Sequence, residues 1–256
     1  MGLRGLSGKV AVVAGGASGL GAATAARLAQ EGCRVVVGDV AVDAAVETAE
    51  RVSDAGGTAV PVAFDLADPS SVADLIRVAS ETFGAVDLLF NVGADMSTLR
   101  ADTDVVGIEL DVWDRVMTVS LRGYLAAMKH AIPAMLQNGG GAIVNMSSAA
   151  AFQGEPTRPA YATAKAGIGA LTRHVASRWG KEGIRCNAIA PGFTATETIR
   201  NAPQWPELEV AALRRIRGTR VGRPEDVAAL VAFLLSDEGE WINGQVVNID
   251  GGTVLR

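Results

Sequence analysis

The sequence predicts an α/β fold in which seven parallel strands form one doubly wound sheet with helices on both faces. Short runs rich in β-branched residues alternate with longer, alanine-rich segments whose apolar residues recur at helical spacing. This alternation is typical of a parallel sheet, because each crossover between parallel strands needs a connecting segment, usually a helix. The predicted strands cover residues 10–14, 34–39, 58–64, 86–91, 142–147, 184–190 and 245–249. The predicted helices cover residues 20–31, 42–55, 70–83, 111–137, 161–180 and 224–235.

Prolines and glycines lie where these helices should begin and end. Pro69 and Pro224 fall where a helix begins, a place that tolerates proline because the first amide protons have no partner within the helix. Gly32, Gly56 and Gly84 follow the ends of the first three predicted helices, where glycine stops a helix by adopting a left-handed conformation.

Composition limits the kind of protein. The 256 residues are 49% hydrophobic, enough for one core, and we expect a single domain over residues 1–256. The formal net charge is -5 and the basic residues are scattered, which argues against a nucleic-acid partner. No signal peptide or membrane-spanning run is evident, and Cys33 and Cys186 lack the spacing of a metal site or disulfide framework. We expect a cytoplasmic protein without a metal or a membrane partner.

Two stretches depart from the rhythm of strands and helices, residues 95–110 and residues 191–206. Both follow a predicted strand, and in open parallel sheets the carboxyl ends of the strands are where ligands bind. Long ordered loops in compact domains usually have a function. We predict that the second stretch belongs to a substrate lid at about residues 192–217.

A glycine-rich turn joins the first predicted strand to the first predicted helix. Residues 14–21 read AGGASGLG, and a turn of this kind in this position is typical of a Rossmann-type dinucleotide fold. Glycine lets the backbone approach phosphate groups, and the helix N-terminus stabilises their charge. The alternative is a flexible turn without a ligand. The cofactor-binding residues assigned to this turn are Gly15, Ser18, Gly19, Leu20 and Gly21.

Asp39 ends the second predicted strand, eighteen positions after Gly21. A carboxylate there can accept hydrogen bonds from both hydroxyls of the adenosine ribose, while it would repel a 2′-phosphate. Neither Gly16 nor Val40 supplies a basic side chain that would offset the repulsion. The sequence therefore favours NAD over NADP; a solvated loop aspartate is the alternative.

Tyr161 and Lys165 are spaced to share one face of a helix, and Ser148 precedes the tyrosine by thirteen positions. A phenol that exchanges protons near neutrality needs a cation beside it. Lowering its pKa from ~10 to neutrality takes about 4 kcal/mol, which one ammonium at ~4 Å supplies at an effective dielectric of ~20. A surface Tyr-x-x-x-Lys pair without chemistry is the alternative interpretation.

Taken together, these residues resemble the single-domain, roughly 250-residue branch of the short-chain dehydrogenase/reductase family. The resemblance covers nearly the whole chain. Its motifs, in order, are Gly15/Gly19/Gly21, Asp65, Asn91, NMSS at residues 145–148, Tyr161-x-x-x-Lys165, Pro191-Gly192 and DGG at residues 250–252. The cofactor contacts it implies are Asp65 and Leu66 at the adenine, Asn91 and Gly93 at the ribose, Tyr161 and Lys165 at the nicotinamide ribose, and Pro191, Gly192, Thr194 and Thr196 at the nicotinamide.

The chain departs from the family pattern at three places. Ala14 replaces the threonine that opens the glycine motif, which removes a hydroxyl. Residues 91–94 read NVGA where the family has NNAG, so hydrogen bonding within that loop must differ. Ser120 stands where the family has a catalytic asparagine, and a shorter side chain there would hold a relay water less well.

The activity that the resemblance implies is hydride transfer between NAD(H) and a secondary alcohol or ketone. Tyr161 would exchange the hydroxyl proton, Ser148 would bind the substrate oxygen, and Lys165 and Ser120 would complete the catalytic set. The alternative is a catalytically weak or inactive NAD-binding sensor or scaffold. An enoyl reductase fits less well, because those relatives space tyrosine and lysine more widely.

The substrate is expected to be a small molecule in a mainly apolar pocket. Met96, Phe193 and the run at residues 149–152 supply apolar surface, while Arg158 or Arg200 could recognise an acid. Steroids, cyclic alcohols, dihydrodiols and acyl chains all remain open. The resemblance also implies a homotetramer.

Overall fold

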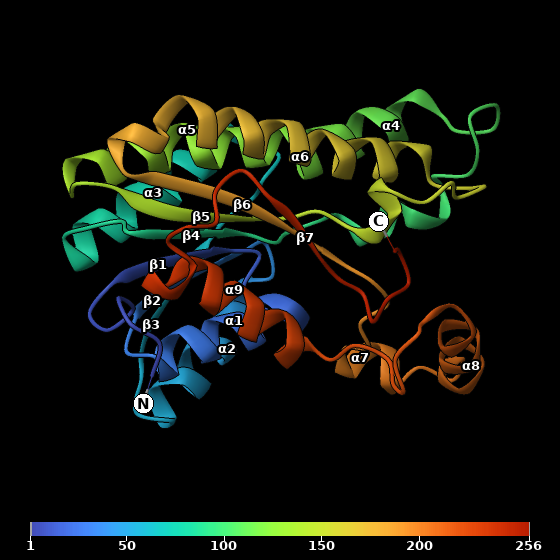
Figure 1. The fold of residues 1–256 in the computed structure, drawn as a ribbon, viewed down its shortest axis with the longest axis horizontal. Helices are drawn as coiled ribbons and strands as arrows, with labels where there is room; N and C mark the ends of the chain where they lie inside the picture. Colours follow the sequence, from blue (N-terminus) through green and yellow to red (C-terminus); the bar gives the residue numbers. More distant parts are fainter. Residues whose placement is uncertain (1, 256) are drawn as a thin grey trace.

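The structure, a computed structural model that describes residues 2–255, has the predicted fold. Seven parallel strands form one sheet in the order β3-β2-β1-β4-β5-β6-β7, and helices cover both of its faces (Figure 1). The order reverses between β1 and β4, the place where ligands bind in sheets of this kind. The prediction of a Rossmann-type, doubly wound, seven-stranded parallel sheet is confirmed.

The strands follow the predicted bounds within about two residues and pair in parallel register. They are β1 Val10–Ala14, β2 Arg34–Asp39, β3 Thr58–Ala63, β4 Leu88–Asn91, β5 Gly141–Met146, β6 Ile184–Pro191 and β7 Val246–Ile249. In the centre of the sheet, Val12 lies between Val36 of β2 and Leu89 of β4. Every residue of β1 is buried, which explains why this strand is apolar throughout rather than alternating.

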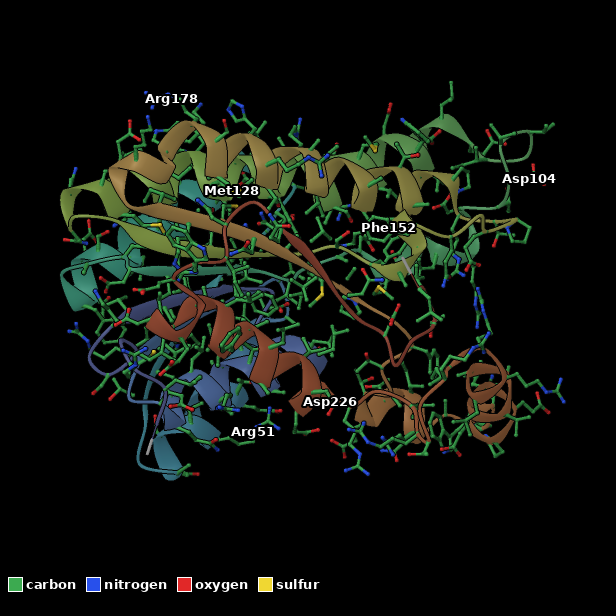
Figure 2. All side chains as sticks on the ribbon, in the orientation of Figure 1. Arg51, Asp104, Met128, Phe152, Arg178 and Asp226 are labelled. Atoms are coloured by element: carbon green, nitrogen blue, oxygen red, sulfur yellow. The ribbon has the colours of Figure 1, made fainter. Side chains whose placement is uncertain are left out.

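Two layers of helices enclose the sheet. The helices of residues 2–255 are α1 Gly19–Gln30, α2 Val42–Asp54, α3 Pro69–Phe83, α4 Leu110–Met117, α5 Gly123–Gln137, α6 Pro159–Trp179, α7 Glu197–Arg200, α8 Trp205–Arg215 and α9 Pro224–Leu235, of which α7 and α8 lie outside the two layers. Figure 1 shows α3, α5 and α6 on one face and α1, α2 and α9 on the other. Met128 of α5 points between its helix and the sheet and is buried, whereas Arg178 of α6 lies on the outer surface (Figure 2). Within residues 2–255, no helix is long and apolar enough to cross a membrane.

The single helix predicted over residues 111–137 is wrong in one respect. Thr118–Arg122 form a π-helical turn between α4 and α5. Such a turn inserts one residue into the helical repeat and re-aims the side chains around it. The turn packs against α6, and Ser120 is buried within it.

The stretch at residues 191–206 is not the irregular connection that the sequence indicated. It contains α7 and the start of α8, and Pro206 lies in the first turn of α8, where proline is tolerated. A small separate core holds this region together, formed by Ala195, Ala212, Ile216 and Val221. In Figure 1 the two helices project beyond the sheet, and in the chain they follow the carboxyl end of β6.

Candidate active site

The glycine-rich turn between β1 and α1 leaves no room for side chains. Gly15 has φ +105° and Gly19 has φ +51°, conformations that residues with a Cβ rarely adopt. A Cβ on Gly15 would overlap the backbone of Gly93, and one on Gly21 would overlap the carbonyl oxygen of Gly15. The turn therefore presents bare backbone at the N-terminus of α1, a natural site for phosphate groups.

Asp39 lies beside this turn at the end of β2 and is half-buried. Its Oδ2 accepts the amide proton of Ala17 at 3.0 Å, and its Oδ1 accepts that of Ala41 at 3.1 Å. The hydroxyl of Thr48 donates to the carbonyl of Ala17 at 3.0 Å and ties α2 to the same turn. The carboxylate is thus held in place by backbone, and each oxygen keeps a free lone pair for a ribose hydroxyl.

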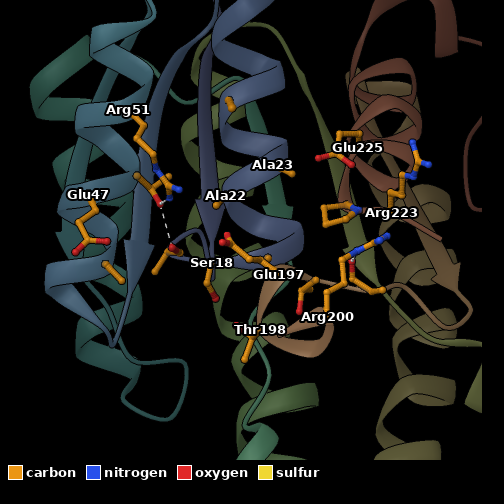
Figure 3. Close-up of a pocket in the computed structure, with 18 of the residues that line it drawn as sticks. Ser18, Ala22, Ala23, Glu47, Arg51, Glu197, Thr198, Arg200, Arg223 and Glu225 are labelled. Atoms are coloured by element: carbon orange, nitrogen blue, oxygen red, sulfur yellow. Dashed lines mark hydrogen bonds between the residues drawn. The ribbon is translucent and has the colours of Figure 1, made fainter. Parts of the chain in front are cut away.

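A cleft of about 700 Å³ opens beside Ser18 and Gly19, between α1, α2 and the segment that follows β6 (Figure 3). Arg51 donates to Thr48 at 2.8 Å within it. The charged residues that line the cleft are Arg51, Arg200 and Arg223 and the acids Glu47, Glu197 and Glu225. Arg200, one of the two arginines considered for recognition of an acidic substrate, therefore lies in this cleft.

The predicted adenine and ribose contacts lie at the ends of β3 and β4. Asp65 Oδ1 accepts the amide proton of Ala67 at 2.7 Å, and Leu66 is buried. Asn91 is fully buried and donates from Nδ2 to Oδ1 of Asn145 at 2.8 Å. Its own Oδ1 is the one buried side-chain nitrogen or oxygen, among the residues described, that lacks a hydrogen-bond partner. An unpaired buried acceptor here fits a ligand that brings a donor.

The predicted proton-transfer residues come together at the end of β5. Ser148 follows β5, and Tyr161 and Lys165 lie one turn apart in α6. The ammonium of Lys165 donates to the carbonyl of Met146 at 2.8 Å and lies 5.6 Å from the centre of the Tyr161 ring. It also lies 5.1 Å from the ring of Tyr124. Lys165 is thus enclosed by backbone carbonyl and aromatic faces, behind the tyrosine.

Burial acts on the two ionisable groups of this trio in opposite senses. It lowers the pKa of Lys165 to about 7, because no carboxylate among residues 2–255 pairs with the ammonium. Burial also raises the pKa of Tyr161, while its hydrogen bond with Ser148 and the charge of Arg158 lower it. Desolvation of both groups therefore opposes the Coulomb stabilisation of the Tyr161 phenolate that the sequence predicts for the Lys165 ammonium.

Ser120 is buried in the π-helical turn, beside α6. Its hydroxyl makes no side-chain hydrogen bond with any residue between 2 and 255. The structure thus places the turn of Ser120 against α6 without a hydrogen bond from its hydroxyl to Tyr161 or Lys165.

A second cavity, of about 320 Å³, adjoins Ser148 and Tyr161. Its apolar wall consists of Met96, Leu99, Ala149, Ala150, Phe193, Leu208, Ala211, Ala212 and Ile216. Residues of α8 therefore face the proton-transfer pair. The charged residues at this cavity are Glu155, Arg158 and Arg215. Arg215 carries no signal in the sequence, because its helix was not predicted.

The segment after β6 reaches both cavities. Pro191 and Gly192 line the one beside Tyr161, and Thr196 lines the cleft beside the glycine turn. Thr196 is close enough to Gly19 that a Cβ there would lie 3.0 Å from its methyl group. Thr194, which lies between Gly192 and Thr196 in the chain, pairs with Gly222 in an isolated β-bridge. The predicted nicotinamide contacts thus lie on one segment that joins the glycine turn to Ser148 and Tyr161.

Asp102, which the sequence did not point to, caps the first turn of α6 from a loop 58 and 59 positions away in the chain. Its Oδ2 accepts the amide proton of Tyr161 at 2.8 Å, and its Oδ1 accepts that of Ala160 at 3.1 Å. Asp102 is 1% exposed, so both bonds are shielded from water. The local cap position holds Arg158, whose side chain does not cap. A helix that begins without Ser, Thr, Asp or Asn was the available signal that the cap comes from elsewhere.

Comparison with known proteins agrees with this geometry. The family model described as enoyl-(acyl carrier protein) reductase matches residues 15–254. A protein of Bradyrhizobium diazoefficiens, named a probable short-chain type dehydrogenase/reductase, is 45% identical over 97% of this chain and 88% of its own. The chain belongs to the short-chain dehydrogenase/reductase family. The family that the motifs resembled is therefore confirmed.

Other short-chain dehydrogenases/reductases are similar over nearly the whole chain. The cis-4-hydroxycyclohexanecarboxylate dehydrogenase of Sinomonas cyclohexanicum is 39% identical over 95% of this chain and 96% of its own. A solved structure of 7α-hydroxysteroid dehydrogenase, in complex with NADH and 7-oxo glycochenodeoxycholic acid, has a TM-score of 0.90 and 29% identity and covers 99% of this chain and 96% of its own. The family includes dehydrogenases that act on alcohols and hydroxysteroids.

Proposed function

We propose that this protein is an NAD-dependent dehydrogenase that interconverts a secondary alcohol and a ketone. The observation that carries the proposal is that Ser148 and Tyr161 border one cavity while the ammonium of Lys165 is buried directly behind the tyrosine ring. The substrate side is supported by relatives named for a hydroxycyclohexane acid and a hydroxysteroid. Both names denote cyclic secondary alcohols, which favours a cyclic substrate.

The residues at the glycine turn fit a dinucleotide. Bare backbone at Gly15 and Gly19, the carboxylate of Asp39 and the unpaired acceptor of Asn91 would hold its phosphates and ribose. The nicotinamide, when bound, supplies the acceptor or donor of the hydride. Because Asp39 repels a 2′-phosphate, we expect NAD to be preferred over NADP.

The protein's own residues manage the proton. Ser148 donates a hydrogen bond to the substrate oxygen, and Tyr161 accepts the hydroxyl proton during oxidation and returns it during reduction. Burial raises the pKa of Tyr161, and the hydrogen bond with Ser148 and the charge of Arg158 offset part of that rise in the protein without substrate. Lys165 stabilises the phenolate from behind, at the distance given above. The segment at residues 192–217 closes the cavity as a lid, since α8 contributes Leu208, Ala211 and Ala212 to its apolar wall.

The first experiment measures oxidation of cyclic and linear secondary alcohols with NAD and NADP, comparing the wild type with Tyr161→Phe. We expect tyrosine-dependent turnover with NAD, and unchanged NADH binding by the variant in a fluorescence titration. Tyr124→Phe removes the only other phenol hydroxyl and should remain active. Turnover that survives in Tyr161→Phe contradicts the acid/base role. NADH binding without turnover of any alcohol favours the sensor or scaffold alternative. In that case the lack of a hydrogen-bond partner for the Ser120 hydroxyl among residues 2–255 would contribute to the loss of catalysis.

We propose that the chain forms a single domain and that four copies of it assemble into a homotetramer. We also propose that the protein is cytoplasmic. Leu125 on α5 and Trp241 after α9 are exposed apolar residues that an assembly would cover. Cys33 and Cys186 are free and buried, as suits a reducing compartment. Sedimentation of a monomer at micromolar concentration contradicts the tetramer.

A further inference from the structure

Three charged side chains meet at the mouth of the cavity beside Tyr161. Glu155 accepts from Arg215 Nη2 at Oε1, at 3.1 Å, and from Arg158 Nη2 at Oε2, at 3.3 Å. Gln153 Oε1 takes a second bond from Arg215 Nη2, at 3.1 Å. The side chain of Glu155 is 12% exposed, whereas those of Arg158 and Arg215 are 39% and 58% exposed. One enclosed carboxylate therefore holds two guanidinium groups that remain open to the cavity.

Both arginines keep donors in reserve. Each uses only Nη2 toward side chains, and Nε and Nη1 have no acceptor among residues 2–255. The two side chains come from different elements, Arg158 from the start of α6 and Arg215 from the last turn of α8. Arg158 is also the only non-glycine residue with a positive φ, +66°, in the described chain. Such a conformation costs free energy and persists where the surroundings fix it.

The charges at this cavity do not cancel. Two guanidinium groups and one carboxylate leave one positive charge in excess among the lining residues, beside a wall that is mostly apolar. A neutral substrate would leave that charge unmatched when it displaces water. One excess charge matches a monoanion such as a carboxylate, rather than a phosphate, which carries ~1.5 to 2 negative charges near neutrality. The unused Nε and Nη1 groups of the two arginines can each donate a charge-assisted hydrogen bond to such a carboxylate.

We propose that the substrate is a compact secondary alcohol that carries a carboxylate, bound by Arg158 and Arg215 while its carbinol lies at Ser148 and Tyr161. This rests on the proposed dehydrogenase function. The cavity of about 320 Å³ lies at the lower end of the range of small-molecule sites, ~300 to 1,000 Å³. Glu155 sets the spacing of the two arginines and competes with the substrate carboxylate for them.

The test compares two probes of similar shape and different charge, cyclohexanecarboxylate and cyclohexanecarboxamide. Binding to the protein saturated with NADH is measured by calorimetry near neutral pH. We expect the carboxylate to bind at least about tenfold more tightly, and Arg215→Gln to remove most of that preference. Arg214→Gln is the matched control, since Arg214 lies next in α8 but outside the cavity lining. Equal binding of the probes, or an equal loss in Arg214→Gln, overturns the proposal.

A second variant separates recognition from a merely structural latch. Glu155→Gln removes the competing carboxylate, so carboxylate binding should tighten and the preference over the carboxamide should rise. If Glu155 and Arg215 serve only to hold α8 in place, Glu155→Gln weakens both probes as Arg215→Gln does, and the proposal fails.

The alcohol panel keeps the two proposals distinguishable. Turnover of cyclohexanol as efficient as that of 4-hydroxycyclohexanecarboxylate leaves the dehydrogenase function standing and contradicts the carboxylate site. Charge-selective probe binding without turnover of any alcohol does the reverse.

Discussion

At the scale of single residues, the position of Asp39 determines which dinucleotide the glycine turn accepts. Its two oxygens are anchored to the amides of Ala17 and Ala41, so the carboxylate cannot swing away from a 2′-phosphate without breaking backbone hydrogen bonds. Repulsion of a phosphate at this site is therefore built into the loop rather than left to a mobile side chain.

Asp39→Asn tests this argument while keeping one acceptor oxygen for the loop. We expect the ratio of kcat/KM for NAD to that for NADP to fall by about tenfold to a hundredfold, because a few kcal/mol of Coulomb repulsion is removed. Steady-state kinetics with both cofactors gives the ratio. Asp43→Asn, an exposed change of the same kind in the first turn of α2, should leave it unchanged. An unaltered ratio in Asp39→Asn refutes the assignment.

At the scale of elements, the first turn of α6 depends on a loop far away in sequence. The carboxylate of Asp102 binds the amide of Tyr161 itself, and the backbone of Arg158 donates to the carbonyls of Asp102 and Thr103. The loop that carries Met96 and Leu99 at the cavity therefore also fixes the first turn of α6. Movement of that loop would shift the tyrosine.

Asp102→Ala should lower both stability and turnover. Loss of a buried cap leaves two amides unpaired and costs about 1–3 kcal/mol of unfolding free energy. A displaced Tyr161 should lower kcat, with little change in KM for NAD, since the glycine turn is untouched. Urea denaturation and steady-state kinetics measure the two effects. Asp104→Ala is the control: its carboxylate caps only its own exposed loop (Figure 2). A fall in stability without a fall in kcat contradicts the positioning role.

Local patterns predicted some elements and not others. The alternation of strands and helices predicts the sheet. The glycine turn is recognisable because its signal lies within a few residues. Ser148, Tyr161 and Lys165 are recognisable from their spacing, since Tyr161 and Lys165 share one helix face. The π-helical turn around Ser120 shifts the apolar spacing too little to see, and it depends on packing against α6. The sequence does not predict α8, because Pro203 and Pro206 near its start indicate an interruption of helical structure. Asp102 acts on amides 58 and 59 positions away, which no local pattern encodes.

At the scale of the whole molecule, one buried lysine makes stability depend on pH. The pKa of Lys165 is about 7 in the folded protein and 10.5 as the ordinary value. Between these values the unfolded chain binds a proton that the folded protein does not, so the free energy of unfolding rises with pH. Burial raises the pKa of the Cys33 and Cys186 thiols to about 12. Above the ordinary thiol pKa of 9.0 the free energy of unfolding falls as the pH rises, because only the unfolded chain loses the two thiol protons.

The free energy of unfolding should accordingly rise by about 1.5 kcal/mol from pH 7 to pH 8.5, and fall again above pH 9. Urea denaturation of the protein without dinucleotide across this range measures it. Lys165→Met should flatten the rise, whereas Lys129→Met, an exposed lysine on α5, should retain it. A flat profile in the wild type contradicts the buried ammonium.

The strand order also governs how the chain is assembled during synthesis. β1 is the first strand made, yet one of its edges stays open until Leu88–Asn91 are available to pair with it. Until then the parallel sheet of β1, β2 and β3 has an open edge along β1, where backbone N–H and C=O groups are unpaired and the side chains are apolar. An edge of this kind can pair with other chains. Fragments that stop before β4 are therefore expected to aggregate, because, among residues 2–255, only Leu88–Asn91 cover the open edge of β1.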